Sequence, residues 1–169
     1  MKVLIVSDIH GGYDNIRKVL DDNPNFDLLL ILGDILYGGN NSEKIAKLLN
    51  QYSSKIISVC GNCDSYTNNS CLNFFDDKLF VTVPVDHKLL FITHGHVYNK
   101  YNTLNFPYDV YIQGHTHVPM MEYSDKLYLN PGSVTRPRGG SDKSYIFYED
   151  GEFFLKSVDY NEVIKVISI

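Results

Sequence analysis

Five short runs of apolar residues divide the chain. They are Val3 to Val6, Leu28 to Leu32, Ile56 to Cys60, Leu89 to Thr93 and Val110 to Gln113. Each run is too short and too uniformly apolar for an amphipathic surface helix, so the pattern predicts five buried strands.

Two segments between the first three runs have the period of an amphipathic helix. One covers Tyr13 to Asp22, and the other follows Ser42, a candidate N-cap. The order strand, helix, strand, helix, strand predicts parallel strands joined by right-handed crossovers. The apolar positions spaced three or four residues apart are Ile16, Val19 and Leu20 in the first segment and Ile45, Leu48, Leu49 and Tyr52 in the second.

The second half of the chain is dominated by strands. From about Lys78 onward there is little room for helices, and Ser144 to Val158 alternates around a turn at Asp150-Gly151. Glycine tolerates the positive φ of a tight turn, so this segment predicts a β-hairpin. We predict an α/β fold of two mixed sheets packed face to face with helices outside. One larger sheet with antiparallel additions is the alternative.

The composition narrows the class of protein. A chain of 169 residues with 44% hydrophobic residues is expected to form one domain spanning residues 1–169. The net charge of −5 has the wrong sign for binding long nucleic acid mainly through its phosphates. No apolar run approaches the roughly 18 residues of a membrane span. The three cysteines, in a chain without an export signal, are expected to be reduced, so we expect a cytoplasmic protein.

A polar cluster follows each apolar run. A lone Asp or His at such a position usually caps a helix or fills a turn. However, the carboxyl ends of strands in an open α/β sheet meet at one edge, where ligands bind. Several buried carboxylates and imidazoles gathered there without a cation would each be costly. The clusters are Ser7-Asp8-Ile9-His10-Gly11, Gly33-Asp34, Gly61-Asn62-Cys63-Asp64, His94-Gly95-His96 and Gly114-His115-Thr116-His117.

Seven side chains of these clusters are candidate metal ligands. Carboxylate, imidazole and amide oxygen suit Mn²⁺, Fe²⁺, Zn²⁺ or a similar divalent ion better than an all-oxygen Ca²⁺ cage. Seven ligands are too many for one tetrahedral site and suit two ions that share a bridging ligand. The seven are Asp8, His10, Asp34, Asn62, His94, His115 and His117.

Taken together, these motifs resemble the calcineurin-like metallophosphoesterase superfamily. The Gly-Asn-Cys-Asp version at residues 61–64, with Asn130-Pro131-Gly132-Ser133, is similar to its small bacterial and archaeal phosphodiesterase branch, the YfcE-like proteins. The resemblance covers nearly the whole chain and implies the metallo-dependent phosphatase fold, a four-layer αββα sandwich. It also implies a phosphodiesterase acting on a small phosphodiester, a nucleotide included, and a homo-oligomer such as a dimer or tetramer.

The resemblance also implies a binuclear metal centre. Two ions can hold a bridging hydroxide as the nucleophile and can clamp a phosphoryl oxygen. Mn²⁺ is the expected ion, with Fe, Zn, Ni or Mg as alternatives. The implied ligands are Asp8, His10 and His117 for one metal, Asn62, His94 and His115 for the other, and Asp34 for both.

One position departs from the larger superfamily. Many members have His after Gly-Asn, whereas this chain has Cys63, a weak hydrogen-bond donor that cannot supply the charge of an imidazolium. We therefore hypothesise a preference for diesters with good leaving groups, such as aryl esters. The catalytic candidates are Asp34, Asn62, Cys63 and His96.

Four further residues have open roles. His96 could contact the substrate, support the ligands, or be a loop histidine outside the site. Asp64 could orient Asn62 or a neighbouring imidazole. Arg136 and Arg138 could contact a phosphate or lie on a solvated loop.

Three rival functions remain open from the sequence. Cys60 and Cys63 have the Cys-x-x-Cys spacing of a redox pair, although Cys60 also reads as the last residue of a strand. The scaffold subunit of the eukaryotic retromer has a similar fold without catalysis, and a fold does not fix a function. A phosphomonoesterase or a nuclease could use the same metal site.

Overall fold

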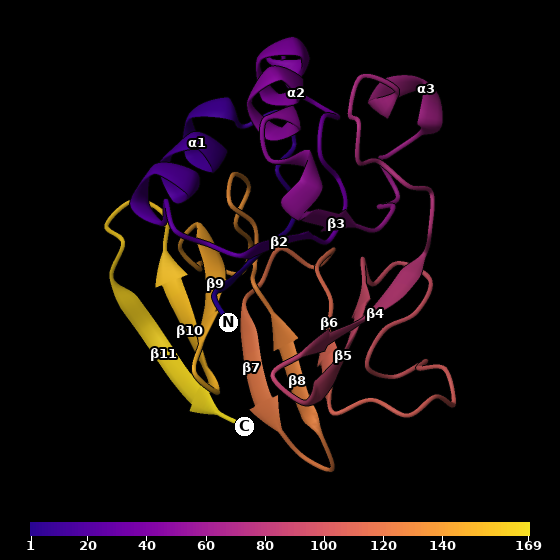
Figure 1. Ribbon diagram of the computed structural model, residues 1–169, viewed down its shortest axis with the longest axis vertical. Helices are drawn as coiled ribbons and strands as arrows, with labels where there is room; N and C mark the ends of the chain where they lie inside the picture. The colour runs from indigo at the N-terminus through magenta and orange to yellow at the C-terminus, as the bar shows by residue number, and fades with distance from the viewer.

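Two mixed β-sheets form the body of the protein (Figure 1). The computed structural model describes residues 1–169, except for the side chains of Tyr66 and Thr67. The first sheet has six strands: β1 (Val3–Val6), β2 (Leu28–Ile31), β3 (Ile56–Ser58), β9 (Ser144–Glu149), β10 (Glu152–Ser157) and β11 (Val163–Ser168). The second sheet has five strands: β4 (Phe80–Val85), β5 (Lys88–Thr93), β6 (Val110–Ile112), β7 (Met120–Tyr123) and β8 (Leu127–Asn130).

The strand order confirms the predicted α/β fold of two sheets. The first sheet runs β11-β10-β9-β1-β2-β3 and the second β4-β5-β6-β8-β7, so one continuous sheet is excluded. β1, β2 and β3 are parallel, as are β5, β6 and β8. The predicted hairpin is β9–β10, and Asp150 and Gly151 in its turn have φ of 51° and 85°.

The predicted helices lie between the first three strands. Helix α1 is Tyr13–Asp22 and α2 is Ser42–Asn50, followed by the 3₁₀ turn η1 (Ser53–Lys55); a short α3 (Tyr66–Asn69) comes after β3. The predicted N-cap at Ser42 is wrong by one residue. Asn41 occupies the cap position and makes no side-chain capping bond, so Ser42 begins the helix.

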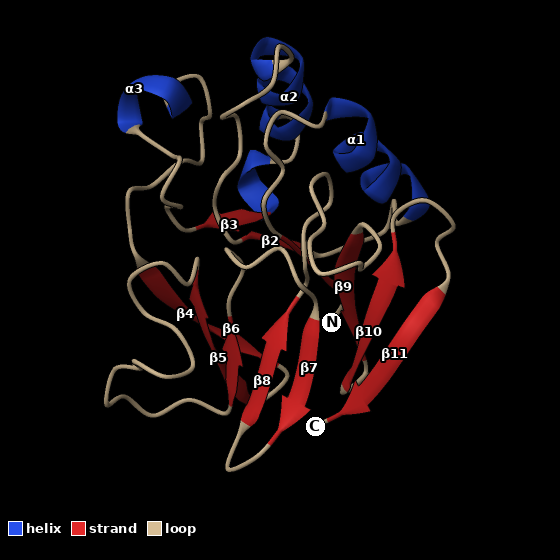
Figure 2. Cartoon of the chain, turned by 180° about the vertical axis from the view of Figure 1, so that it is seen from behind, coloured by secondary structure: helices blue, strands red, loops and turns tan.

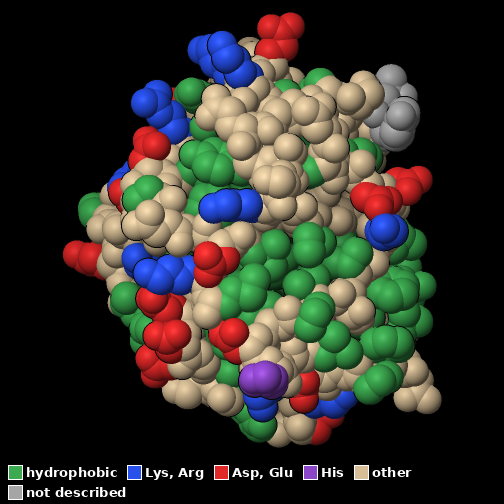
Figure 3. Space-filling model, in the orientation of Figure 1, with side chains coloured by type: hydrophobic (Ala, Val, Ile, Leu, Met, Phe, Trp, Pro, Cys, Tyr) green, Lys and Arg blue, Asp and Glu red, His purple; other side chains and the backbone are tan. Residues whose placement is uncertain are grey.

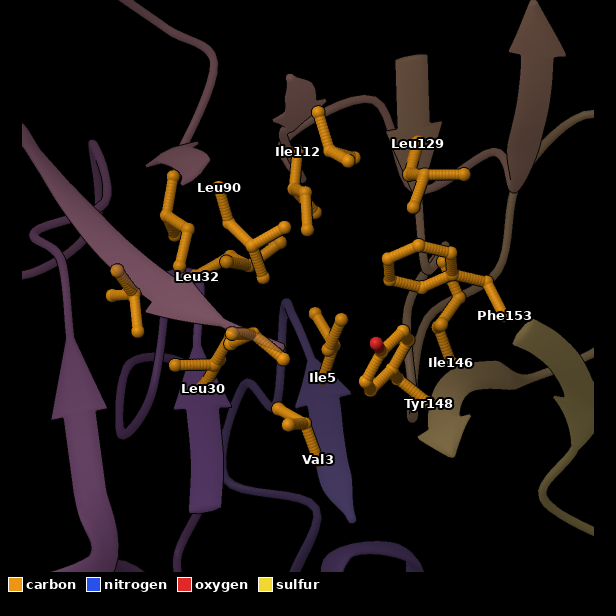
Figure 4. Packing of buried hydrophobic residues seen from close by; sticks show 14 of the residues in the cluster. Val3, Ile5, Leu30, Leu32, Leu90, Ile112, Leu129, Ile146, Tyr148 and Phe153 are labelled. Carbon is orange, nitrogen blue, oxygen red and sulfur yellow. The ribbon is translucent and has the colours of Figure 1, made fainter. Parts of the chain in front are cut away.

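Two apolar layers hold the sheets and helices together. Between the sheets, Ile5 and Leu30 of the first sheet face Leu90, Ile112 and Leu129 of the second (Figure 4). A second layer joins the outer face of the six-stranded sheet to α1 and α2, which lie together on one side of it (Figure 2). No helix among the described residues is long and apolar enough to cross a membrane.

A non-helical loop, residues 94–109, covers part of the outer face of the five-stranded sheet. Its Tyr98 packs on Phe80, and its Tyr108 packs on Phe91 and Tyr111. Hydrophobic side chains also gather over this half of the molecule in the space-filling view (Figure 3). Aromatic packing thus takes the place that a second helical layer would have in a four-layer sandwich.

The carboxyl ends of the parallel strands converge at one edge. Backbone hydrogen bonds join the loops there: Asp8 N donates to Gly33 O at 3.2 Å, and His10 N donates to Asp34 O at 2.9 Å. In the second sheet, Gly114 N donates to His94 O at 2.8 Å. The polar clusters are therefore tied to one another by the backbone.

We predict that Leu30→Ala lowers the free energy of unfolding by about 2–5 kcal/mol, because Leu30 is fully buried between the sheets. Chemical denaturation measures the change. Val166→Ala, on the exposed face of β11, is the control and should change stability by less than about 0.5 kcal/mol. A loss below about 1 kcal/mol for Leu30→Ala would contradict the inter-sheet core.

Candidate metal centre and active site

A cavity of about 400 Å³ lies at the edge where the two sheets' loops meet. It is bordered by the loops that follow β1, β2, β3 and β6 and by the 136–138 segment. Five of the seven candidate ligands line it directly: His10, Asp34, Asn62, His115 and His117. The other two, Asp8 and His94, are fully buried beside them.

The rings of His10 and His117 face each other. Their Nε2 atoms are 3.3 Å apart, and Asp8 Oδ1 lies 3.7 Å from the first and 3.1 Å from the second. His10 Nδ1 donates to Tyr37 O at 3.2 Å and His117 Nδ1 donates to Arg136 O at 2.6 Å. Because a carbonyl oxygen only accepts, both neutral rings carry their proton on Nδ1 and present a lone pair at Nε2.

His94 has the same arrangement on the other side of Asp34. Its Nδ1 donates to Leu32 O at 2.6 Å, which leaves the Nε2 lone pair directed to Asn62 Oδ1 at 3.1 Å. Asp34 Oδ2 lies 3.6 Å from Nε2 of His94 and 3.6 Å from Nε2 of His10. Asp34 is therefore between the two groups of side chains.

In these contacts the Nε2 atoms of neutral imidazoles face oxygen atoms, so two hydrogen-bond acceptors meet with no proton between them. A proton on His117 would satisfy its contact with Asp8, and that contact raises the pKa of His117. Burial lowers the pKa of His10, however, so its ring stays neutral beside both carboxylates. Asp8 Oδ1 is buried and makes no hydrogen bond of regular geometry. Divalent cations fit this donor set, because each would accept several lone pairs at once.

Three overlapping groups of ligand atoms are close enough to share an ion. Within each group the atoms all lie within 4.8 Å of one another. The groups are Asp8, His10 and His117; Asp8, Asp34 and His94; and His10, Asp34 and Cys63. The presence of Asp8, His10 and Asp34 in two groups each indicates a continuous site rather than separate ones.

Hydrogen bonds aim the carboxylate of Asp8 into the site. Its Oδ2 accepts from Ser7 Oγ at 2.7 Å and from His115 N at 3.0 Å, so Oδ1 is left for the site. Ser133 Oγ donates to the backbone O of Asp8 at 2.8 Å. Burial would raise the pKa of Asp8, but its contact with His117 and the hydrogen bond from Ser7 bring it below its ordinary value.

Asp64 has a different role from the predicted one. Instead of orienting Asn62 or an imidazole, its carboxylate accepts the backbone N–H of Asp34 at 2.7 Å, Ile35 at 3.0 Å and Gly61 at 2.9 Å. It thereby joins the loops after β2 and β3. These loops are so close that a Cβ on Gly61 would overlap Asp34 Oδ1.

Backbone strain is concentrated at the candidate ligands. Five of them are in the left-handed region, which costs an L-residue other than Gly about 1–2 kcal/mol. They are Asp8 (φ 54°), His10 (44°), Asp34 (53°), His115 (67°) and His117 (60°). Strain of this kind persists where surrounding contacts over-determine the conformation and is typical of functional sites.

His115 and Cys63 lie at the rim of the site. The His115 ring is 5.1 Å from that of His94, but none of the close ligand groups includes it. Cys63 N donates to Asp34 Oδ1 at 2.8 Å. Burial, with the neighbouring Asp34, raises the pKa of the Cys63 thiol to about 11, so the thiol is protonated at neutral pH. Cys60 is a free thiol too, so the structure holds no disulfide between them.

His96 and the two arginines border the site without joining a ligand group. The His96 ring is 5.3 Å from the His94 ring, and its buried Nδ1 has no hydrogen-bond partner among the described residues. Arg136 and Arg138 line the cavity, and Arg136 Nη2 also donates to Gly38 O at 2.6 Å. No carboxylate of the described residues forms an ion pair with either arginine.

No sequence signal marks the groups that orient the imidazoles, because these groups are the backbone carbonyls of Leu32, Tyr37 and Arg136. Ser7 and Ser133 were also missed as partners of Asp8. The turn predicted at residues 130–133 has a structural role here: Asn130 Nδ2 donates to Gly114 O at 2.9 Å, which supports the loop of His115 and His117.

Known proteins are similar to this chain in sequence and in structure. Residues 1–150 match the calcineurin-like phosphoesterase superfamily domain. Phosphodiesterase YfcE of Escherichia coli (strain K12) is 34% identical over 182 residues, covering 100% of this chain and 98% of that protein. The solved structure of Yfce, a phosphoesterase from E. coli, has a TM-score of 0.91, 30% identity and full coverage of both chains.

Two more distant likenesses are informative. A symmetrical bis(5'-nucleosyl)-tetraphosphatase of Buchnera aphidicola is 32% identical over 90 residues, covering 47% of this chain and 33% of that protein. Wild-type Vps29 of Entamoeba histolytica, solved with Zn²⁺, shares the fold alone, with a TM-score of 0.66, 17% identity, and coverage of 100% of this chain and 98% of that one.

The family match covers most of the chain, and the match to YfcE covers all of it. Divalent metal ions are implied by membership of such a family, and the clustered donors of the site fit them. The chain belongs to the calcineurin-like phosphoesterase superfamily.

Proposed function

We propose that this protein is a phosphodiesterase that depends on two divalent metal ions and hydrolyses small phosphodiesters. One observation carries the proposal: three imidazoles have their Nδ1 protons fixed on carbonyl oxygens, so their Nε2 lone pairs meet the oxygens of Asp8, Asp34 and Asn62. The full-length similarity to YfcE supports diester hydrolysis as the reaction.

The side chains divide into two groups that could hold one ion each. We assign Asp8, His10 and His117 to the first ion and Asn62, His94 and His115 to the second, with Asp34 shared. The position of Asp34 Oδ2, 3.6 Å from both His10 and His94, supports a shared ligand. When bound, two divalent ions generate a nucleophile from water near neutral pH and neutralise charge on the phosphoryl group. Mn²⁺ suits this mixture of carboxylate, imidazole and amide ligands.

The remaining residues act on the substrate around this centre. Arg136 and Arg138, free of carboxylate partners among the described residues, can bind phosphate oxygens that enter the 400 Å³ cavity. The Cys63 thiol is protonated and can give only a weak hydrogen bond to a leaving oxygen. A diester with a good leaving group needs little such help.

Small nucleotide diesters are the substrate class we favour. The name of the Buchnera relative, a nucleosyl tetraphosphatase, supports a nucleotide, and the net charge of −5 argues against long nucleic acid.

A non-catalytic scaffold would have no need for a site in which nitrogen and oxygen lone pairs face one another. No described feature favours a phosphomonoesterase. The free thiols suit a reducing compartment such as the cytoplasm.

We predict that the purified protein binds two Mn²⁺ per chain and hydrolyses bis(p-nitrophenyl) phosphate when Mn²⁺ is added. Asp34→Asn should lower kcat/KM by about 100-fold or more, because it removes the shared negative ligand. Elemental analysis and a colorimetric assay measure both quantities. A wild-type protein that binds metal but does not hydrolyse the diester would contradict the proposed function.

The Cys63→His variant tests the leaving-group hypothesis. An imidazole at this position donates a stronger hydrogen bond than a thiol, so the rate on alkyl esters should rise relative to aryl esters by about 10-fold or more. Steady-state assays with methyl p-nitrophenyl phosphate and a dialkyl phosphate give the two rates. An unchanged ratio would mean that the thiol position does not act on the leaving group.

The Asp64→Asn variant separates loop positioning from direct metal binding. An amide nitrogen cannot accept the N–H groups that Asp64 now accepts, so we expect about 1–3 kcal/mol lower stability and about 10- to 100-fold weaker Mn²⁺ binding. Asp21→Asn, on the exposed face of α1, is the matched control and should leave metal binding unchanged. Equal metal affinity in Asp64→Asn and the wild type would contradict the positioning role.

A further inference from the structure

A second cavity, of about 550 Å³, adjoins the candidate metal centre. His115 lines both cavities, so the two spaces adjoin at this residue. Met121 belongs to the core between the sheets, and strand residues alternate, so Met120 and Glu122 face the outer side of the five-stranded sheet. Both of them line the second cavity, which therefore lies on this outer side.

The loop wall of this cavity is held by hydrogen bonds. Lys100 N donates to the Gln113 side chain at 3.0 Å, which ties the loop to the end of β6. Asn99 and Asn102 form a backbone bridge, and Tyr101 N donates to Asn99 Oδ1 at 3.0 Å. The tip of the loop is thus fixed before a ligand binds, which lowers the entropy cost of binding.

The two cavities differ in charge. Arg136 and Arg138 line the first cavity without carboxylate partners among the described residues, so it suits an anion. In the second cavity, Lys100 Nζ is 2.7 Å from Glu122 Oε2, so the charges there cancel. This second cavity suits an uncharged group better than another phosphate.

The lining of the second cavity is suited to a flat ring with a polar edge. Tyr101 and Met120 contribute an aromatic ring and a polarisable thioether, both of which pack favourably on aromatic rings. His96 also lines the cavity, and its buried Nδ1 has no partner among the described residues. An imidazole can donate or accept a hydrogen bond at its ring nitrogens, so His96 offers a polar partner in the wall of this cavity.

We propose that this cavity binds one ester group of the phosphodiester substrate and selects an uncharged aromatic ring there, as found in a nucleobase or an aryl ester. The inference rests on the proposed function, because His115 links the cavity to the place where the phosphate would bind. Tyr101 and Met120 pack on the ring, and His96 bonds its polar edge. The substrate class is therefore a diester with at least one neutral aromatic ester group.

Calorimetric titration of the Mn²⁺-loaded protein tests this. The ligands are thymidine 5′-monophosphate, phenyl phosphate, ribose 5-phosphate and inorganic phosphate. We expect the nucleotide to bind the wild type at least about 10-fold more tightly than ribose 5-phosphate does. Phenyl phosphate shows whether the ring alone is sufficient: affinity equal to the nucleotide's indicates an aryl group, and weaker affinity indicates a nucleoside.

Two variants and one control locate the effect. Tyr101→Ala lies on an exposed loop and Met120→Ala on a partly exposed strand, so both should fold. Each should reduce the ring preference to about 3-fold or less while leaving the Kd of inorganic phosphate within about twofold. Tyr123→Ala, a 68% exposed tyrosine that does not line the cavity, should keep the full preference.

Hydrolysis of bis(p-nitrophenyl) phosphate by the same preparations distinguishes a failure of the cavity proposal from a failure of the proposed function. Wild-type hydrolysis with no ring preference, or with a preference that neither variant reduces, overturns the cavity proposal and leaves the proposed function standing. Absence of both hydrolysis and phosphate binding overturns both.

Discussion

The structure of the site depends on three hydrogen bonds from imidazole Nδ1 atoms to backbone carbonyls. The carbonyls of Tyr37, Leu32 and Arg136 fix the tautomers of His10, His94 and His117, so the Nε2 lone pairs all face inward. Opposite them are carboxylate and amide oxygens, which are acceptors as well. Neutral side chains cannot satisfy such an arrangement, and divalent cations can. The backbone geometry therefore orients the imidazoles for metal binding.

The fold provides the rigidity that this arrangement requires. Parallel strands of both sheets end at one edge, and backbone hydrogen bonds join the loops that follow them. The Asp64 carboxylate adds two further bonds between the loops after β2 and β3, and a third within the loop after β3. These contacts keep five candidate ligands in left-handed backbone conformations that would relax in a mobile loop. Stability elsewhere, in the two apolar layers, offsets this local cost.

Much of this architecture could be predicted from the sequence. The runs Val3 to Val6 and Leu28 to Leu32 are uniformly apolar because those strands are buried on both faces. Clusters such as Asp8-Ile9-His10 directly follow a strand, so their meeting at one edge is a consequence of parallel topology. The side chains that gather at this edge are therefore the ones that directly follow the predicted strands.

Other features have no counterpart in a single sequence. Every residue has a backbone carbonyl, so residue type does not indicate which carbonyl accepts from each imidazole. The conformation of the loops decides this. The sequence predicts Asp64 in the right region but with the wrong partners, because three of its hydrogen bonds come from backbone N–H groups and another from the Asn69 side chain. The loop of residues 94–109 is stabilised by aromatic contacts across the five-stranded sheet, which local periodicity cannot indicate. The second cavity depends on that same loop.

Anomalous diffraction from crystals soaked in Mn²⁺ tests the central claim most directly. The account predicts two peaks, one among Asp8, His10 and His117 and one beside His94 and Asn62, with Asp34 between them. A map without peaks at these positions, with the three imidazoles still bonded to their carbonyls, would contradict it.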